Sequence, residues 1–320
     1  MTLKILFIGD PVAELKPGRE TTLALIFEAQ RRDMNVDYCT AKDLCLTNGK
    51  VIGRVQSITL NDNLNDHIHT AAARMQNLAA YDIIVLRSNP AGYARIDTSY
   101  VLDILADKVL IVNDPRGIRE MHGKYFISQL PDFIVPYAFV EHPEHLKVFM
   151  DEHKDVIIKP VNGFGGYGIR RVKEKPADIN TLFDEIYTEY GNSPFIVQPF
   201  IADAVKGDKR IILFDGVPVC AMLRVPADED SLANVTQGAR TQKCEMTPRE
   251  QALCEELGPV LRDYGLFFTG IDMLGDYLTE INLISVGTIV PANELYGIRL
   301  EKTFWDMLLE KHEQFHQPSE

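Results

Sequence analysis

The sequence lacks several features that would assign it to whole classes of protein. No apolar run approaches the roughly 18 residues of a membrane-spanning helix. The N-terminal apolar stretch reaches an acid at Asp10, too soon for a secretory signal. The five cysteines are odd in number and never spaced C-x-x-C, so we expect neither a zinc ribbon nor a disulfide framework. These absences predict a protein of the reducing cytoplasm.

Positive charge is also scarce, because 33 lysines and arginines stand against 46 aspartates and glutamates. The resulting net charge of −13 argues against binding to nucleic acid, where phosphate neutralisation dominates the affinity. It argues equally against an anionic membrane surface. We therefore expect small-molecule partners, no nucleic acid and no membrane, and we expect the chain to form a homo-oligomer.

The chain is long enough, at 320 residues and 46% hydrophobic composition, for two or three domains with ample cores. We place the units at residues 1–122, 123–194 and 195–320. In the first unit strands alternate with helical patterns, which predicts an open parallel sheet covered on both faces. The predicted strands are Lys4–Ile8, Val36–Tyr38, Asp82–Leu86 and Val109–Val112.

Ligands of such sheets lie beyond the carboxyl ends of the strands. Asp10 and Arg87 both follow predicted strands, so both are candidate site residues, although Arg87 could equally form a surface ion pair. Between them, Asn48-Gly49 predicts a hairpin turn. The polar run Asn61–His69 is interpreted as a loop leading into a helix.

The second unit contains a glycine-rich stretch between two short strands, Val156–Ile158 and Ile169–Val172. Glycine lets backbone N–H groups crowd against an anion, and an adjacent lysine adds a point charge for phosphates. No Gly-Lys-Ser/Thr and no helix follow, which excludes the P-loop and the Rossmann fingerprint. The alternative to a phosphate-binding loop is a flexible surface hairpin. Lys124 would lie near Lys159, and an anion is the natural occupant between two lysines. The residues concerned are Lys124, Lys159, Gly163, Gly165, Gly166 and Gly168.

In the third unit, Gln198-Pro199-Phe200 ends a predicted strand and could border a flat base, although a plain strand end is the alternative. Hairpin strands are predicted at Asp208–Phe214 and Val217–Arg224. A long polar loop, Pro226–Lys243, contains Asn234 and Arg240, and long loops are often functional. Thr247-Pro248-Arg249-Glu250 then forms a capping box for a helix that runs to about Tyr264.

The most specific chemistry lies in a predicted hairpin over Phe268–Leu283. If it is centred on Asp276, Asp272 faces Glu280 directly, and Asn282 projects from the same face. Opposed carboxylates are unfavourable without a cation, and all three side chains offer hard oxygen ligands suited to Mg²⁺. Three solvated polar residues on an exposed face remain the alternative. The intervening Ile271, Met273, Ile281 and Leu283 are predicted to enter a core.

Together these features resemble the ATP-grasp ligases, and among them the bacterial glutathione synthetases, over nearly the whole chain. The blocks that carry the resemblance include Gly-Asp-Pro at 9–11, Asn-Asp-Pro at 113–115, Ile-Lys-Pro-Val-Asn-Gly-Phe-Gly-Gly at 158–166, Gly-Asp-Lys-Arg-Ile at 207–211 and Gly-Ile-Asp-Met-Leu-Gly-Asp-Tyr-Leu-Thr-Glu-Ile-Asn at 270–282. The resemblance implies an α/β and α+β protein, an ATP-grasp fold preceded by a Rossmann-like parallel-sheet domain.

The resemblance also implies a reaction. ATP phosphorylates a carboxylate and an amine then attacks the acyl phosphate, so that an amide, ADP and phosphate form. In the family these substrates are γ-glutamylcysteine and glycine, and the metal is Mg²⁺, with Mn²⁺ possible.

The roles implied by the resemblance fall into three groups. Lys124, Lys159 and the glycines at 163, 165 and 166 would contact ATP phosphates, Gln198, Pro199 and Phe200 the adenine, and Asp208 the ribose. Asp272, Glu280 and Asn282 would hold magnesium, and Arg210 would stabilise the acyl phosphate together with Lys159 and Asn282. The substrate side would comprise Asp10, Arg87, Arg224, Asn234, Arg240, Ser285 and Gly287.

The departures from the family pattern lie on the substrate side. Ile284-Ser285-Val286-Gly287-Thr288 stands where Thr-Ser-Pro-Thr-Gly is usual, and Ser231-Leu232-Ala233-Asn234 replaces Thr-Arg-Gly-Asn. A Lys-Asp pair near the N-terminus becomes Arg19-Glu20. A related ligase with a different carboxylate and amine, or a non-catalytic nucleotide-binding relative, therefore stays open beside glutathione formation.

Overall fold

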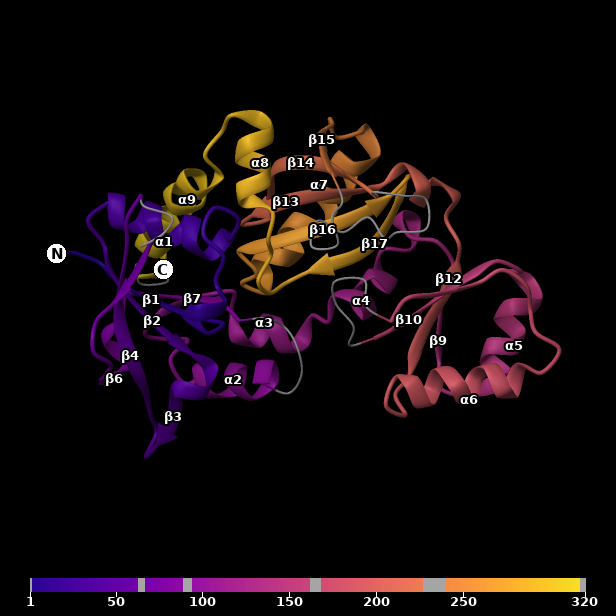
Figure 1. Ribbon diagram of the computed structural model, residues 1–320, viewed down its shortest axis with the longest axis horizontal. Coiled ribbons are helices and arrows are strands. Elements are labelled where there is room, and N and C mark those ends of the chain that lie inside the picture. The colour runs from indigo at the N-terminus through magenta and orange to yellow at the C-terminus, as the bar shows by residue number, and fades with distance from the viewer. Residues whose placement is uncertain (1, 63–66, 89–93, 162–167, 227–239, 317–320) are drawn as a thin grey trace.

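Three β-sheets follow one another along the chain, each with its own helices (Figure 1). The computed structural model describes residues 2–62, 67–88, 94–161, 168–226 and 240–316. Within these ranges no helix is both long and apolar enough to cross a membrane. The N-terminal sheet is mixed and is parallel at its centre, and two antiparallel sheets follow it.

The N-terminal sheet runs in the order β3-β4-β2-β1-β7-β8, and β5 and β6 pair with β4. Alternate side chains of β1 enter different cores: Ile5 and Phe7 pack toward α1 and α9, whereas Leu6 and Ile8 join a cluster with Leu102 of α2. The predicted sheet with two covered faces is thereby confirmed. The elements are β1 (Lys4–Gly9), α1 (Thr21–Arg31), β2 (Asn35–Thr40), β3 (Leu44–Thr47), β4 (Lys50–Leu60), β5 (Ile68–Thr70), β6 (Arg74–Asn77), β7 (Ile83–Arg87), α2 (Ala94–Asp103), β8 (Leu110–Val112) and α3 (Pro115–Glu120).

The region between residues 48 and 80 was only partly predictable. The hairpin turn at Asn48-Gly49 is confirmed, since both residues adopt positive φ and Thr47 pairs with Lys50. The expected helix after residue 61 is wrong, because β5 and β6 stand there instead. The physical reason is β4, whose 11 residues extend past β2 and offer a long edge that both short strands pair with.

The second sheet is antiparallel, in the order β11-β10-β12-β9. The strand expected in the third unit before Phe200 belongs here instead, because β12 pairs with both β10 and β9. Helices α5 and α6 cover one face, where Phe149, Phe183 and Phe195 lie in a shared apolar cluster (Figure 1). The predicted hairpin is confirmed, because β10 pairs with β11, while its tip at 162–167 lies outside the described residues. The elements are α4 (Gly123–Phe126), β9 (Ala138–Val140), α5 (Pro143–Glu152), β10 (Val156–Pro160), β11 (Arg170–Val172), α6 (Ile179–Glu189) and β12 (Phe195–Pro199).

The third sheet runs in the order β15-β14-β13-β16-β17 and is antiparallel throughout. Helix α7 covers one face, and its predicted capping box between Thr247 and Glu250 is confirmed. The stretch predicted as one long loop at 226–243 instead ends in a strand, β15, whose residues pair with the edge of β14. The elements are β13 (Asp208–Phe214), β14 (Val217–Val225), β15 (Arg240–Lys243), α7 (Pro248–Asp263), β16 (Phe268–Leu274) and β17 (Tyr277–Asn282).

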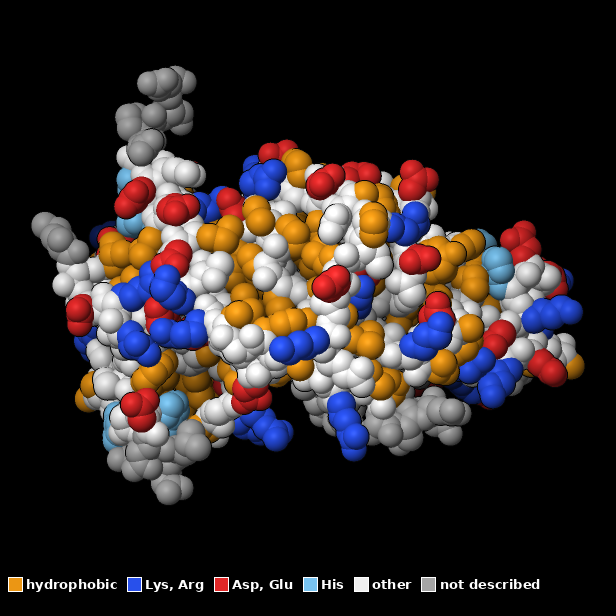
Figure 2. Space-filling view, turned by 90° about the horizontal axis from the view of Figure 1, so that it is seen from above, with side chains coloured by type: hydrophobic (Ala, Val, Ile, Leu, Met, Phe, Trp, Pro, Cys, Tyr) orange, Lys and Arg blue, Asp and Glu red, His pale blue; other side chains and the backbone are white. Residues whose placement is uncertain are grey.

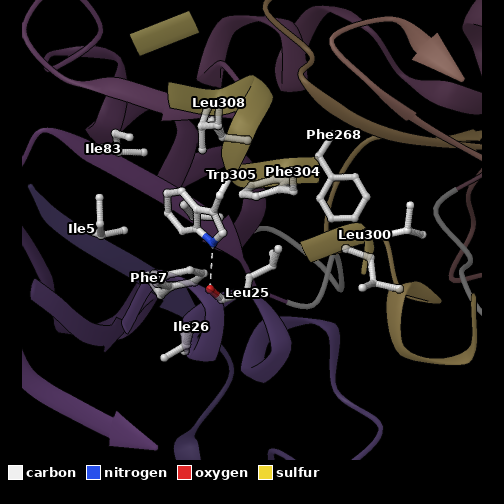
Figure 3. Packing of buried hydrophobic residues seen from close by; sticks show 14 of the residues in the cluster. Ile5, Phe7, Leu25, Ile26, Ile83, Phe268, Leu300, Phe304, Trp305 and Leu308 are labelled. Atoms are coloured by element: carbon white, nitrogen blue, oxygen red, sulfur yellow. Dashed lines mark hydrogen bonds between the residues drawn. The ribbon is translucent and has the colours of Figure 1, made fainter. Parts of the chain in front are cut away.

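Two C-terminal helices, α8 (Ile289–Tyr296) and α9 (Leu300–Phe315), join the third sheet to the first. Figure 3 shows the aromatic packing behind this connection: Trp305 lies edge-on to Phe7 and Phe304, and Phe304 lies edge-on to Phe268. The indole N–H of Trp305 donates to the carbonyl of Leu25 in α1 at 2.8 Å. The first and third units therefore share one hydrophobic core.

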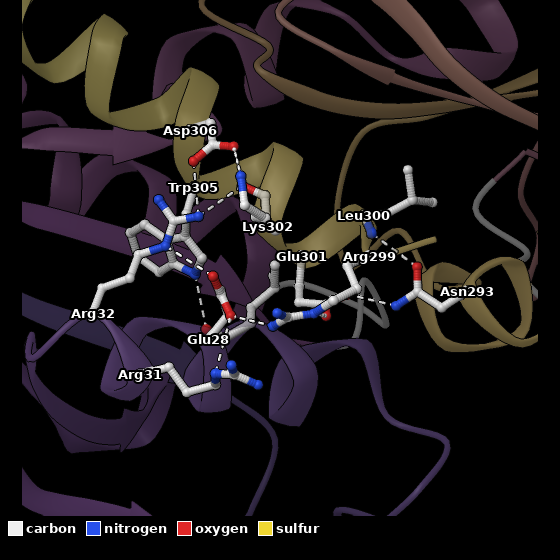
Figure 4. A network of polar contacts seen from close by, with 11 residues as sticks. Glu28, Arg31, Arg32, Asn293, Arg299, Leu300, Glu301, Lys302, Trp305 and Asp306 are labelled. Carbon is white, nitrogen blue, oxygen red and sulfur yellow. Dashed lines mark hydrogen bonds and ion pairs between the residues drawn. The ribbon is translucent and has the colours of Figure 1, made fainter. Parts of the chain in front are cut away.

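A network of polar side chains also joins α1 to the start of α9 (Figure 4). Glu28 of α1 is 95% buried and accepts from Arg32 at 3.0 Å and from Arg299, which also pairs with Glu301 at 3.0 Å. Because a buried carboxylate is costly unless it is paired, this network favours one docking of α9 on α1. Elsewhere on the surface, the face in Figure 2 shows acidic and basic side chains intermixed.

Candidate active site

The polar face of the third sheet changes character along its strands. On β13, Ile212 and Phe214 lie in the core shared with α9, whereas Arg210 and Asp208 on the same face are charged. The other face stays apolar throughout, and Ile271, Met273, Ile281 and Leu283 enter the α7 core as predicted. The third sheet lies next to the second (Figure 1), and Lys159 of the second sheet donates to the carbonyl oxygen of Thr279 in β17, so side chains of both sheets meet at this end.

The predicted opposition of Asp272 and Glu280 is confirmed, since the two residues are paired across β16 and β17. Asn282 pairs with Gly270 on the same hairpin and donates from Nδ2 to Asp272 Oδ2 at 3.0 Å. The expected turn at Gly275-Asp276 is confirmed, but the pairing next to it is not centred on Asp276, since Leu274 pairs with Tyr277, and a β-bulge after Asp272 restores the expected register. The three oxygen-bearing side chains therefore share one end of the hairpin.

Two arginines neutralise Asp272. Arg210 binds its carboxylate through Nε at 2.5 Å and through Nη2 at 2.9 Å, and Arg224 contacts it at 2.9 Å. Arg224 also forms a two-pronged pair with Asp208. Burial opposes ionisation of Asp272, but the two arginines outweigh it and hold the pKa of its carboxyl well below the usual range. The cluster thus forms a buried ladder of alternating charge across three strands.

Lys124 and Lys159 converge on the same end of the hairpin. Lys159 donates to the carbonyl oxygen of Thr279 at 3.3 Å. Lys124 donates to the carbonyl oxygen of Pro160 at 3.1 Å, and its Nζ lies 3.9 Å from Oε1 of Glu280. Burial lowers the pKa of Lys159 to about 8, Glu280 opposes this and the nearby charge of Lys124 adds to it. Burial also lowers the pKa of Lys124. The predicted approach of the two lysines is confirmed.

A close backbone contact brings Lys124 to the hairpin, and the sequence analysis missed it. A Cβ on Gly123 would collide with the carbonyl oxygen of Ile281, which lies between Glu280 and Asn282. Only glycine lets α4 approach β17 so closely. One glycine before a short helix carries no distinguishing signal in a sequence, because the contact joins residues far apart along the chain.

The donor set fits a divalent cation that keeps other ligands. Among the described residues no three His, Cys, Asp or Glu side chains come together. Asp272 and Glu280 supply two carboxylates and Asn282 an amide, and the side chain of Glu280 is 31% exposed and pairs with Lys124 at 3.9 Å. Mg²⁺ is typically bound by one or two carboxylates, with water and phosphate completing its shell. The chemistry of these three residues therefore suits Mg²⁺ or Mn²⁺.

A second charged position lies at the carboxyl edge of the first sheet. Arg87 is 97% buried, donates from Nε to Thr22 at 3.2 Å, and lies over the ring of Phe268 with its Cζ 5.3 Å from the centroid. Burial lowers its pKa to about 10, opposed by Glu20, Tyr38 and Asp10. The Ser285 hydroxyl donates to the Arg87 carbonyl oxygen at 3.1 Å. The segment at 284–288, where the sequence differs from the family pattern, therefore lies at this edge of the sheet.

Two helices begin beside Arg87, and neither has a side-chain N-cap. The N–H of Ile289 at the start of α8 donates to Thr21 at the start of α1, at 3.3 Å. Helix N-termini attract anions through their uncapped N–H groups. A Cβ on Gly287 would meet open space, so the backbone is accessible there. Arg87, the two N-termini and Gly287 thus form a second cationic position.

The remaining predicted residues have mixed surroundings. Asp10 follows β1, and its carbonyl oxygen accepts from Tyr38 at 2.6 Å. At this strand end we expected the backbone N–H of Phe200 to be free, but it donates to the carbonyl oxygen of Asp155. The guanidinium of Arg171 covers the Phe200 ring, with its Cζ 3.3 Å from the ring centroid. Gln198 and Pro199 lie in β12 beside β10. Arg240 is exposed at the start of β15. Gly163, Gly165, Gly166 and Asn234 lie outside the described residues.

Comparisons with known proteins agree with this geometry. The N-terminal domain of prokaryotic glutathione synthetase matches residues 3–119, and the ATP-grasp domain of prokaryotic glutathione synthetase matches residues 123–297. The chain is 35% identical to the glutathione synthetase of Mesorhizobium japonicum, covering 96% of this chain and 98% of that protein. It is 31% identical to that of Escherichia coli, covering 88% and 90%.

Solved structures resemble it in fold. The D-cycloserine synthetase DcsG superposes with a TM-score of 0.66 at 13% identity and covers 95% of this chain and 99% of its own. A D-alanine–D-alanine ligase from Bacillus anthracis superposes with a TM-score of 0.60 at 11% identity, covering 98% of both chains. At these identities the likeness concerns the fold alone.

The Gly123 contact leads to a first prediction. Gly123→Ala should lower the free energy of unfolding by about 1–3 kcal/mol, because the methyl group must displace α4 or β17. Chemical denaturation checks this, with Gly287→Ala as the stability control because its methyl group meets open space. Equal stabilities of the two variants would contradict the close contact.

Proposed function

The chain belongs to the prokaryotic glutathione synthetase family and is an ADP-forming, ATP-dependent ligase; on this premise we propose that it joins γ-glutamylcysteine to glycine and so forms glutathione. The single observation that carries the assignment of its site is the convergence of two buried lysines on the Asp272–Glu280 pair. Cations and acids at one sheet end suit a polyphosphate with a divalent ion.

The nucleotide half of the site is assigned to the second and third sheets. Lys124 and Lys159 would contact the phosphates of ATP together with Gly163, Gly165 and Gly166 of the hairpin tip. Buried ammonium groups act in a low dielectric, where their attraction for phosphate is strongest. Gln198, Pro199 and Phe200 would border the adenine, and Asp208 the ribose. The position of β12 beside the Lys159 strand supports the adenine assignment.

Asp272, Glu280 and Asn282 would hold Mg²⁺, which Mn²⁺ could replace. When bound, the ion would neutralise phosphate charge during phosphoryl transfer. The chain's own residues hold the surrounding charges in place: Asn282 orients Asp272 by donating to it, and Arg210 grips the same carboxylate. Arg210, with Lys159 and Asn282, is proposed as the group that stabilises the acyl phosphate, since its guanidinium already faces this position.

The carboxylate end of the peptide substrate is assigned to Arg87. Burial disfavours the charge of the Arg87 guanidinium, and the nearby Glu20 and Asp10 offset this only in part, since its pKa is still lowered to about 10. A substrate carboxylate would therefore stabilise the guanidinium further. The N-terminus of α1, where no N-cap side chain bonds the first turn, favours the same occupant, whereas the first N–H of α8 is already bonded to Thr21. Asp10, Ser285 and Gly287 lie around this edge and complete the proposed substrate side with Arg224, Arg240 and Asn234.

A second candidate function, with a different substrate pair, follows from the segment at 284–288, where the sequence differs from the family pattern. Ser285 and Thr288 both adopt positive φ, at 49° and 79°, although neither is glycine. Their side chains stand beside Arg87 and the start of α8, so a different amino acid or peptide could fit there. Within this candidate the nucleotide half and the reaction class stay the same, and only the carboxylate and amine change.

We propose that the enzyme works in the cytoplasm as a homo-oligomer on small-molecule substrates. Five free thiols, at Cys39, Cys45, Cys220, Cys244 and Cys254, support a reducing compartment. The net charge of −13 supports the absence of nucleic acid and anionic membrane among its partners.

A coupled assay of ADP release tests the proposed function. We expect turnover with ATP and Mg²⁺ only when γ-glutamylcysteine and glycine are both present. Asp272→Asn should reduce this rate at least 100-fold while the circular dichroism spectrum stays unchanged. Turnover with another carboxylate and amine pair would select the second candidate, and ATP binding without turnover for any pair would indicate a non-catalytic relative.

The lowered pKa of Lys159 predicts a pH dependence. Below pH 8 the side chain is an ammonium and attracts phosphate, whereas above its pKa of about 8 it becomes neutral. The dissociation constant of ATP should therefore be nearly constant up to pH 7.5 and then rise about tenfold per pH unit. Calorimetric titration from pH 6.5 to 9.5 checks this. Lys159→Arg stays charged and should give a flat profile; a flat wild-type profile would refute the assignment.

The Arg87 assignment predicts a selective loss of substrate affinity. Arg87→Gln should raise the KM of the peptide substrate about 100-fold, corresponding to about 2.7 kcal/mol, with the KM of ATP changed less than twofold. Arg87→Lys keeps the charge but loses the two-pronged geometry, so an intermediate effect is expected. Equal increases in both KM values would argue for a purely structural role of Arg87.

A further inference from the structure

The side chain of Asn113 joins the first sheet to both strands of the Asp272 hairpin. It directly follows β8 and is 96% buried. Its Nδ2 donates to the carbonyl oxygens of Phe268 at 2.8 Å and Leu283 at 2.7 Å, and its Oδ1 accepts from the Phe268 N–H at 2.7 Å. One amide therefore makes three bonds, all to backbone atoms and all between distant parts of the chain.

These bonds lie where the hairpin's own pairing ends. The register of β16 and β17 ends at Gly270 opposite Asn282, and Phe268 and Leu283 lie just beyond that pair. Asn113 bridges the two strands at this open end in place of a further backbone pair. The next residue adds a second connection, since the N–H of Asp114 donates to the carbonyl oxygen of Gly265 at 3.0 Å.

The same bonds also set the position of Arg87. Asn113 holds the backbone of Phe268, and the ring of Phe268 lies under the Arg87 guanidinium. Asn113 holds Leu283 as well, two residues before Ser285, whose hydroxyl bonds the Arg87 carbonyl. Moreover β7, which ends in Arg87, pairs in parallel with β8, which ends just before Asn113. The Asn113 side chain thus contacts both the backbone that positions Arg87 and the backbone of the Asp272 hairpin.

We propose that Asn113 is a positioning residue that sets the spacing between the Arg87 position and the Asp272–Glu280–Asn282 set. The proposal rests on the proposed function, in which Arg87 holds the substrate carboxylate end and the three side chains hold a divalent ion. Reacting groups must be held close to their productive geometry, and a shift of about 1 Å can cost about 100-fold in rate. Asn113 acts through backbone atoms and touches neither nucleotide nor substrate.

The test uses Asn113→Asp, which preserves shape but removes both N–H donors and turns a carboxylate toward two carbonyl oxygens. We expect Mn²⁺ affinity in the presence of ADP, measured by electron paramagnetic resonance of free Mn²⁺ without turnover, to fall at least tenfold. We also expect kcat to fall at least tenfold while the KM of ATP changes less than threefold. Asn113→Ala and Asn113→Ser should show the same pattern, and they decide the question if the aspartate variant does not fold.

Gln30→Glu is the matched control. Its amide also connects a helix to strand backbone, donating to Ile58 O at 2.7 Å and accepting from Leu60 N at 3.1 Å, but it joins α1 to β4 and makes no bond to the Asp272 hairpin. It should lose stability and keep both Mn²⁺ affinity and kcat. Position 113 variants that lose only stability, as the control does, would overturn the positioning role. Failure of the wild-type protein to bind Mn²⁺ with ADP would instead refute the proposed ion site.

Discussion

The buried pairing of Asp272 with Arg210 and Arg224 is the interaction on which the site depends. Taking a carboxylate out of water is costly, and the two guanidinium groups make it tolerable at the end of an otherwise apolar sheet. Together with Lys124, Lys159, Asp208 and Glu280, the cluster carries four cations and three acids, which leaves one net positive charge. A divalent ion raises this excess, so only a polyanion can restore neutrality. In the proposed function, the cluster would therefore bind ion and nucleotide together in preference to either alone.

Such a cluster works only if its walls keep their places, and these walls come from all three units. Gly123 lets the start of the second unit contact β17, Lys159 reaches from β10 to Thr279, and Trp305 and Glu28 fasten the C-terminal helix to α1. Each contact joins parts of the chain that a domain division separates. The first and third units share a core around Phe304 and Trp305, and Phe126, Leu130 and Phe133 at the start of the second unit pack into the core of the third sheet and α7.

Prediction from the sequence succeeded where periodicity and local pairing decide the outcome. The alternation over Phe268–Leu283 was enough to place Asp272 opposite Glu280, even though the pairing next to the turn is not centred on Asp276 and a bulge compensates. It failed where a distant partner decides. The segments that became β5 and β6 take their conformation from the edge of β4, and β15 takes its conformation from β14. Gly123, Asn113 and the Arg87 surroundings escaped for the same reason, because each depends on contacts between residues far apart along the chain.

The backbone of the segment at 284–288 is constrained more tightly than its sequence suggests. A left-handed conformation costs a non-glycine residue about 1–2 kcal/mol, and two such residues, Ser285 and Thr288, stand within four positions. Glycine at either position would remove that cost, so the side chains are retained at the expense of local stability. Val286 between them is 98% buried and anchors the loop in the shared core. The Ser285 hydroxyl is fixed on Arg87. Under the proposed assignment of this edge to the substrate, selectivity would depend on the side chains of Ser285 and Thr288, which a backbone anchored by Val286 holds in place.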